Sequence, residues 1–324
     1  MATRQRIHRK IRKATTHSVD RSEAASPVPH KPARTVLLAT DGSRAAGAAI
    51  KFARAMADAG AWVPEVITVL QPLPVTVADV ALPSSTFYSE PALTDGVIGS
   101  IRRQLLRLGG ASWNFGFEFG SAARSIVELA HARKAELIVI GLGKHGKLAR
   151  LFGAETAARV CRLTDTPVLA VDEHEGKLPH TAVVAMDFGD SSVRAAREAL
   201  ALLQPPGRLH MIHVNWTMSL RSLQDPAWDR TYADGVAHGF DRLQKELAPP
   251  PGIEITSELR HGGVIEEIVK AAKVFHADLL AAGSHSQNII DRLIIGNTPA
   301  VLLREAKCSV LVAPPIKMSD PRTA

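Results

Sequence analysis

The strongest constraint on the fold is that the chain repeats itself at a fixed spacing. AELIVIG, which ends at Gly141, is matched by ADLLAAG, which ends at Gly283, 142 residues later. TPVLAV at 166–171 is matched by CSVLVA at 308–313 with the same spacing. A repeat of this length in 324 residues fits two domains of ordinary size. We therefore expect two copies of one folding unit, at 35–174 and 180–317, joined by a linker at 175–179.

Each copy alternates short apolar runs with helical patterns. In the first copy the predicted strands are 36–39, 63–70, 114–120, 136–140 and 167–171, and helices are predicted around 43–60, 101–108, 125–135 and 156–163. In the second copy, 209–214 and 278–282 are strands two and four. Short, nearly all-apolar strands separated by helices predict a parallel sheet covered on both faces. The predicted fold class is α/β, with two tandem doubly wound five-stranded parallel sheets.

A carboxylate follows the first strand of each copy. Asp41 lies in TVLLATDGS and Asp187 lies in TAVVAMDFGDSS. Doubly wound sheets bind ligands beyond the carboxyl ends of their strands, so both aspartates are placed at the edge where a ligand is expected. The alternative is that each aspartate only stabilises the turn into the next helix. Ser43 and Ser191 are predicted to cap those helices.

Glycines mark the loop after strand four in both copies. The second copy reads GSHSQNIIDRLIIGNTP, from Gly283 to Pro299, and the first reads GLGKHGKLARLFGAET, from Gly141 to Thr156. Glycine lets backbone N–H groups approach a phosphate closely, and the helix that follows directs its positive end toward the same group. The loops therefore predict phosphate binding at the same edge as the aspartates.

Together these segments resemble the universal stress protein family, over about 280 residues. The features that carry the resemblance are ATDGS after strand one, a Gly-x2-Gly-x9-Gly-Ser/Thr loop after strand four and a final strand of the PVLAV type. The resemblance implies a Rossmann-like sheet of the adenine nucleotide alpha hydrolase type. It also implies a pseudo-twofold pair of copies whose final strands meet edge to edge. One subclass of the family binds ATP with Mg²⁺ or Mn²⁺ through these segments, and another lacks the glycine loop and does not.

The resemblance also assigns nucleotide-binding residues to each copy. In the second copy they are Ala185, Met186, Asp187, Val214, Gly283, Ser286, Gly296 and Asn297. In the first copy, where the site is expected to be weaker, they are Ala39, Thr40, Asp41, Val69, Gly141, Lys144 and Gly153. The first loop has Lys144 at the middle glycine of the pattern, Ala154 in place of the final hydroxyl, and one residue fewer. The second loop departs less, because Ser286 and Asn297 are small polar replacements.

The net charge of +7 belongs to the N-terminal segment. Residues 1–34 contain nine Lys/Arg and two acidic residues, whereas the rest of the chain has 30 of each kind. We expect residues 1–34 to be a disordered basic tail and residues 318–324 to be a short tail. Any nucleic-acid binding is expected to be weak and to occur through the basic tail. Cys161 and Cys308 show no metal-ligand spacing and are predicted to be buried reduced thiols, which indicates a cytoplasmic protein.

The predicted function is an ATP-binding regulatory or protective module of the stress response, with at most slow hydrolysis. The alternative is a scaffold that binds no nucleotide and acts through protein partners. The chain lacks the GKS/GKT sequence of a P-loop ATPase and the HIGH and SGGxDS signatures of related nucleotide enzymes. No catalytic residue and no metal ligand is predicted. Self-association is expected as a pair of copies within the chain, with a homodimer as a further option, and no membrane-spanning segment is expected.

Overall fold

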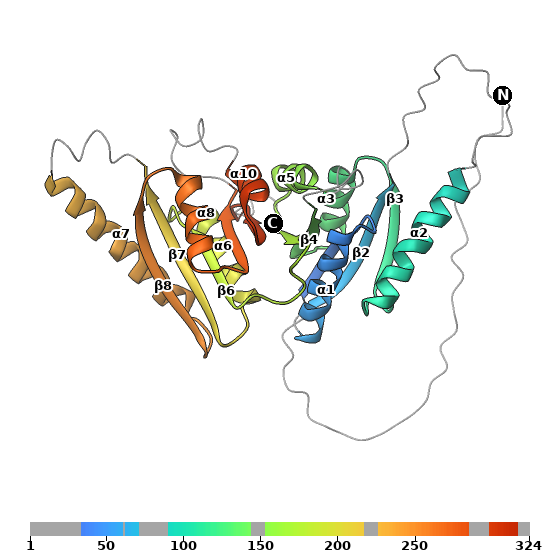
Figure 1. The fold of residues 1–324 in the computed structure, drawn as a ribbon, viewed down its shortest axis with the longest axis horizontal. Helices are drawn as coiled ribbons and strands as arrows, with labels where there is room; N and C mark the ends of the chain where they lie inside the picture. Colours follow the sequence, from blue (N-terminus) through green and yellow to red (C-terminus); the bar gives the residue numbers. More distant parts are fainter. Residues whose placement is uncertain are drawn as a thin grey trace, which may run out of the picture. The chain divides into compact units, whose positions relative to one another are not determined.

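The computed structural model describes residues 34–60, 62–70, 90–143, 153–216, 226–284 and 298–316 (Figure 1). Residues 1–33 of the basic tail therefore lie outside the described residues, as do four of the predicted site residues, Lys144, Ser286, Gly296 and Asn297. Arg34, the last residue of the predicted tail, instead begins the first strand. The elements below belong to the described part of the chain.

The first copy forms alternating strands and helices in the predicted order. They are β1 (Arg34–Ala39), α1 (Arg44–Asp58), β2 (Trp62–Leu70), α2 (Glu90–Arg107), β3 (Asn114–Phe119), α3 (Ala122–Ala132), β4 (Leu137–Leu142), α5 (Ala154–Leu163) and β5 (Val168–Asp172). Helix α2 begins at Glu90, well before the predicted 101. Gly96 and Gly99, which have low helix propensity, hid its first turns from the sequence pattern.

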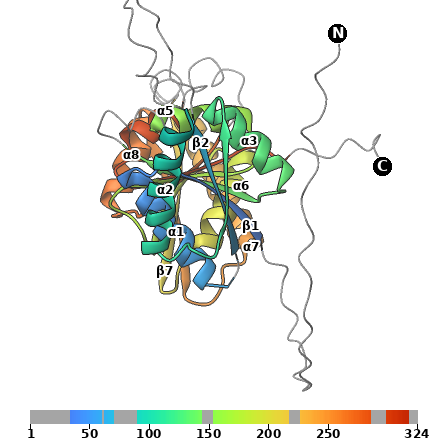
Figure 2. The ribbon, with the colours of Figure 1, turned by 90° about the vertical axis from the view of Figure 1, so that its right-hand side faces the viewer.

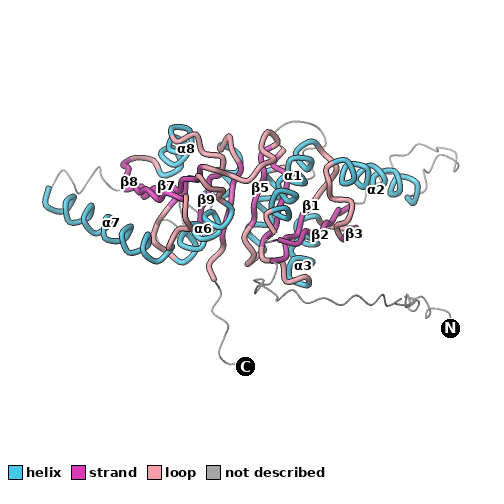
Figure 3. The backbone as a smooth tube through the Cα atoms, turned by 90° about the horizontal axis from the view of Figure 1, so that it is seen from below, coloured by secondary structure: helices cyan, strands magenta, loops and turns pink. Residues whose placement is uncertain are grey.

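The second copy repeats this order. Its elements are β6 (Thr181–Ala185), α6 (Asp190–Leu202), β7 (Gly207–Asn215), α7 (Pro226–Leu247), β8 (Ile253–His261), α8 (Val264–Val274), β9 (Leu279–Gly283), α10 (Thr298–Glu305) and β10 (Ser309–Ala313). The tandem repeat read from the sequence is thus present as two βαβ series. In Figure 3, α1 with α2 and α6 with α7 occupy corresponding places in the two copies.

The two copies share one ten-stranded sheet in the order β3-β2-β1-β4-β5-β10-β9-β6-β7-β8. Strands are parallel within each copy, whereas β5 and β10 pair antiparallel, with Leu169 opposite Leu311. The predicted edge-to-edge meeting of the final strands is confirmed. Leu169 and Leu311 have no exposed surface, and the Asp172 N–H donates to Ser309 Oγ at 3.2 Å across this seam. The ion pair of Arg34 with Glu198, at 3.0 Å, also joins the two copies.

Helices cover both faces of the sheet, as predicted for short apolar strands. Val36 and Leu38 of β1 face a core built with α1 and α2, whereas Leu37 and Ala39 face a core built with α3 and α5. Figure 2 looks onto the first copy and shows α1 and α2 on one side of the strands and α3 on the other. In the second copy, α6 and α7 belong to the first core and α8 and α10 to the second.

Both cysteines are buried and neither forms a disulfide, which confirms that part of the prediction. Burial raises the pKa of the Cys161 thiol to about 12, so the thiol is protonated at neutral pH and unreactive as a nucleophile. Among the helices of the described ranges, none is both long enough and apolar enough to cross a membrane.

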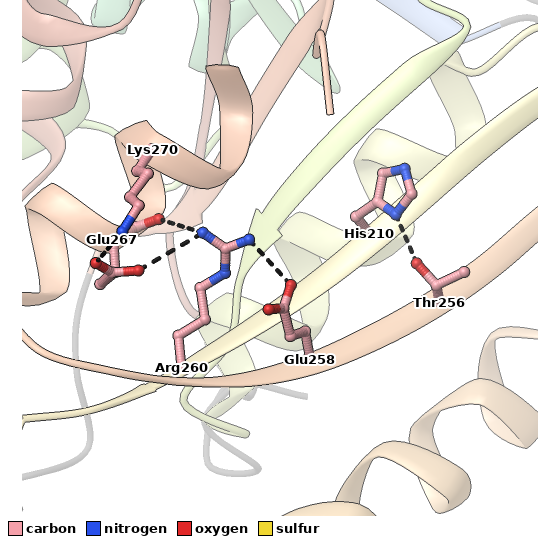
Figure 4. A network of polar contacts seen from close by, with 6 residues as sticks. All are labelled: His210, Thr256, Glu258, Arg260, Glu267 and Lys270. Atoms are coloured by element: carbon pink, nitrogen blue, oxygen red, sulfur yellow. Dashed lines mark hydrogen bonds and ion pairs between the residues drawn. The ribbon is translucent and has the colours of Figure 1, made fainter. Parts of the chain in front are cut away.

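Strand β8 forms one edge of the sheet. Charged side chains of β8 and of helix α8 form a network there (Figure 4). Arg260 contacts Glu258 at 3.0 Å and Glu267 at 3.6 Å, and Lys270 contacts Glu267 at 3.3 Å. Charged side chains on an edge strand disfavour pairing with a further sheet. This network therefore has a structural role at the sheet edge, although the buried Arg260 Nε has no hydrogen-bond partner within the described residues.

His210 of β7 lies near this network in an apolar setting. Its Nδ1 lies 2.5 Å from Thr256 Oγ1, and its ring stacks on Phe275 with a centroid distance of 3.9 Å. Burial, followed by the charge of Arg208, lowers the pKa of His210 below its ordinary value. The native state therefore holds His210 neutral at a pH where the unfolded chain would begin to protonate it.

This difference predicts that part of the stability is lost on acidification. Because the pKa is lowered in the folded state, the His210 contribution is fully present above the ordinary pKa of about 6.5 and decreases as the pH falls below it. We expect His210→Phe to lose less free energy of unfolding between pH 7 and pH 5 than the wild-type chain does. Urea unfolding at several pH values measures this, and an equal loss in both proteins would contradict the assignment.

Candidate functional site

The turn after the first strand has the same construction in both copies. Asp41 Oδ1 accepts the N–H of Ser43 at 2.8 Å, and Asp187 Oδ1 accepts the N–H of Gly189 at 2.9 Å. The residue between has positive φ in each case, +76° for Gly42 and +61° for Phe188. The aspartates therefore stabilise the turn, as the alternative interpretation held. These bonds use Oδ1 alone, so a turn role and a ligand role are compatible.

The cap that follows the turn differs between the copies. Ser43 is the N-cap of α1, and its side chain accepts from the Ala46 N–H, which confirms its predicted role. The prediction that Ser191 caps α6 is wrong. The N-cap is Gly189, which corresponds to Ser43 when both are counted from the aspartate, so Ser191 falls inside the first turn and is buried.

Strand two fixes the residue that precedes each aspartate. The buried Thr68 hydroxyl donates to the Thr40 carbonyl at 2.7 Å. At the corresponding position of the second copy, His213 Nδ1 lies 2.7 Å from the Met186 carbonyl, and its Nε2 lies 2.7 Å from the Tyr232 hydroxyl. Because a carbonyl only accepts, Nδ1 carries the proton. The sequence reasoning missed these residues, although a polar residue at the same position of two apolar strands was a signal.

The sequence also did not reveal the role of Phe188, which in the second copy takes the place that Gly42 has in the first. A bulky residue with positive φ is strained, and here the ring packs on Phe240 and His213 at centroid distances of 5.1 and 5.3 Å. It also covers Gly239 of α7. The aromatic cluster holds the strained turn, so Asp187 is positioned from α7 and β7 as well as from its own strand.

Gly141 and Gly283 allow a close approach of the sheet to a helix. A Cβ at Gly141 would lie 2.6 Å from both the Ala45 carbonyl oxygen and the Ala46 nitrogen in the first turn of α1. A Cβ at Gly283 would lie 2.9 Å from the Ser192 nitrogen of α6. Helix packing alone therefore requires glycine at both positions, a role that the loop pattern did not reveal.

The glycine loop of the first copy is closed at its base. Gly143, at the end of β4, forms a parallel β-bridge with Gly153. Gly153 is the N-cap of α5 and has no side chain to satisfy the first N–H groups of that helix. An uncapped helix N-terminus beside the end of a parallel strand is a common anion site. The corresponding loop of the second copy lies outside the described residues.

The other predicted site residues are mostly buried. Ala39, Thr40, Val69 and Val214 are each at most 8% exposed. The N–H groups of Thr40 and Met186 donate to Ile67 and Ile212 of strand two, so these two N–H groups are already paired. Val69 and Val214 belong to the core formed with α3 and α8, which gives them a packing role. Ala185 packs against the same core and is only partly buried.

Clusters that could bind a metal ion do not appear in the described part of the chain. Within those residues, no three His, Cys, Asp or Glu side chains come together in a way that could hold a metal ion. The chemistry that the edge supports is binding, through two carboxylates, helix N-termini and glycine-bearing backbone.

Family comparison agrees with this geometry. The family description "Universal stress protein family" matches residues 32–172 and 179–314. The chain belongs to the universal stress protein family. It is a tandem member, since the match occurs twice along the chain.

Individual relatives are distant. "Universal stress protein MJ0531" of Methanocaldococcus jannaschii is 25% identical over 134 residues, which is 40% of this chain and 79% of that protein. A universal stress protein from Archaeoglobus fulgidus DSM 4304 has a similar crystal structure, with a TM-score of 0.57 and 17% identity over 87% of this chain and 97% of that one. A putative universal stress protein from Pseudomonas aeruginosa UCBPP-PA14 gives a TM-score of 0.58 and 17% identity over 88% and 94%. At these identities the solved structures support the fold.

Proposed function

We propose that this tandem universal stress protein binds ATP at the carboxyl edge of its sheet and acts as a nucleotide-dependent regulatory or protective module. The observation that carries the proposal is the repeated turn, in which Asp41 and Asp187 are held in the same conformation beside helix N-termini. The loops after β4 and β9, with the glycines of the family pattern, support phosphate binding at that edge.

The aspartates would bind the ribose hydroxyls or a metal ion on the phosphates. A magnesium or manganese ion would be held mainly by the phosphates and water, because the described residues offer no cluster of protein ligands. We propose binding with at most slow hydrolysis, because the sequence lacks the GKS/GKT motif of a P-loop ATPase. A protein of this kind would work in the cytoplasm.

The test is the effect of Mg²⁺-ATP on thermal stability. A ligand at about 100 times its dissociation constant stabilises the native state by about 2.7 kcal/mol, which is a shift of several degrees in Tm for a chain of this size. We expect this shift in the wild-type chain and its loss in the double variant Asp41→Ala/Asp187→Ala.

The matched control is Asp58→Ala, which removes an exposed carboxylate paired with Arg54 at the far end of α1. It should keep the full shift. Equal Tm shifts in the double variant and in this control would show that ATP does not bind at the carboxyl edge. If Mg²⁺-ATP does not raise the Tm of the wild-type chain, the alternative function is favoured, a scaffold that binds no nucleotide.

A further inference from the structure

A cavity of about 430 Å³ lies along α1, beginning at Arg44 next to the turn that holds Asp41. It is bounded by α1, the last turn of α2 and the segment that follows β5. None of the residues assigned above to nucleotide binding is among the described residues that line it. Its volume suits a small molecule.

One wall of the cavity is basic. Arg44 and Lys51 come from α1, and Arg107 comes from α2. Within the described ranges, no ion pair is recorded for these three side chains, although Arg54 of the same helix α1 is paired with Asp58 at 2.7 Å. The cavity therefore presents cationic groups that are available to an anion.

The facing wall offers hydrogen-bond acceptors. Glu173 and Glu175 line it, and burial, followed by the charges of Asp278 and Asp172, raises the pKa of Glu175. Gln104 donates its Nε2 to the Ser43 carbonyl at 3.0 Å, but its buried Oε1 has no partner. Gln104 belongs to α2, the helix of Arg107, and its Oε1 has almost no exposed surface, so the acceptors that face the basic wall are the two glutamates.

The second copy fills the corresponding position with its own side chain. Counted from the aspartates, Ala48 of α1 corresponds to Arg194 of α6. Arg194 Nη1 donates to the carbonyls of Pro314, at 3.1 Å, and Asp165, at 3.0 Å, which closes the segment after β10 onto α6. The small residues Gly47 and Ala48 leave this space open in the first copy.

We propose that this cavity is a second binding site, which takes a small phosphate ester that also carries hydroxyl groups. The phosphate binds Arg44, Lys51 and Arg107. The hydroxyl groups donate to the glutamates of the facing wall, Glu173 and Glu175. The site lies next to the Asp41 turn but, among the described residues, shares no lining residue with the proposed nucleotide site.

The experiment is a calorimetric titration with ribose 5-phosphate, the probe chosen because it has both features. We expect saturable binding by the wild-type chain and no binding of ribose. The double variant Lys51→Gln/Arg107→Gln should bind at least about tenfold more weakly, because two charge-assisted contacts are lost. Arg103→Gln, which removes an exposed charge of α2 outside the cavity, should bind as the wild type does.

A second variant tests the cavity by filling it. Ala48→Arg introduces the arginine that the second copy has at the corresponding position, Arg194, and should abolish ribose 5-phosphate binding. An unchanged circular dichroism spectrum would show that this variant is folded. The double variant Asp41→Ala/Asp187→Ala should retain binding, which separates this site from the nucleotide site. The proposal is overturned if the wild type does not bind, if Lys51→Gln/Arg107→Gln binds as well as Arg103→Gln does, or if binding is lost with the aspartates.

Discussion

Gly141→Ala should lower the free energy of unfolding by about 2–3 kcal/mol, the upper range for overpacking a close-packed interior. The added methyl group would lie 2.6 Å from the Ala45 carbonyl oxygen and the Ala46 nitrogen. Both are backbone atoms in the first turn of α1, so no side-chain rotation relieves the contact. The helix cannot move away easily, because Ile50, Phe52 and other residues of α1 are at most 1% exposed.

Urea unfolding followed by tryptophan fluorescence measures this effect. Gly116→Ala is the matched control, since it is also a glycine in a strand of the first copy and a Cβ there meets nothing within 4 Å. The control should stay within about 0.5 kcal/mol of the wild type. If Gly141→Ala is as stable as Gly116→Ala, β4 and α1 do not lie as close together at Gly141 as the structure shows.

The second large effect concerns the two nucleotide sites, which we expect to be unequal. The first loop has Lys144 where the family pattern has its middle glycine and Ala154 in place of a hydroxyl, and it is one residue shorter. In addition, Glu155 lies in the first turn of α5, whereas the first turn of α10 has no acidic residue. A carboxylate beside a bound phosphate opposes it, and one lost hydrogen bond alone costs roughly 1 kcal/mol, or about fivefold in affinity.

A calorimetric titration with Mg²⁺-ATP should therefore show one tighter site in each chain. Asp187→Ala should abolish that site, and Asp41→Ala should largely spare it. The opposite pattern would mean that Lys144 makes the first loop the better phosphate site. Two sites of equal affinity would mean that neither the departures of the first loop nor Glu155 affects the affinity for ATP.

Much of the fold could be predicted because it depends on periodic burial. The strands around Leu37, Ile138 and Leu169 are almost wholly apolar, and their repetition in the second copy indicated two parallel sheets. The edge-to-edge meeting of β5 and β10 was predicted from the family resemblance, and the structure shows that the pairing is antiparallel. The start of α2 was missed, because its first turns contain two glycines and their pattern is weak.

The details of the candidate site were harder to predict, because they depend on contacts between distant segments. The predicted positions of Asp41 and Asp187 at the ends of β1 and β6 are confirmed. The local sequence could not show that Thr68 hydrogen-bonds to the carbonyl of the residue before Asp41, or that His213 does the same before Asp187. The sequence also could not show that Gly283 faces α6, or that Phe188 adopts the positive φ that Gly42 adopts in the first copy.

The most direct test of the central claim is native mass spectrometry of the intact chain with added Mg²⁺-ATP. The account predicts a folded chain that gains the mass of one ATP first and of a second at higher concentration. The variant Asp41→Ala/Asp187→Ala should gain neither. A folded wild-type chain that carries no nucleotide at roughly 1 mM ATP, where even a binding free energy of about −4 kcal/mol would half-fill a site, would contradict it.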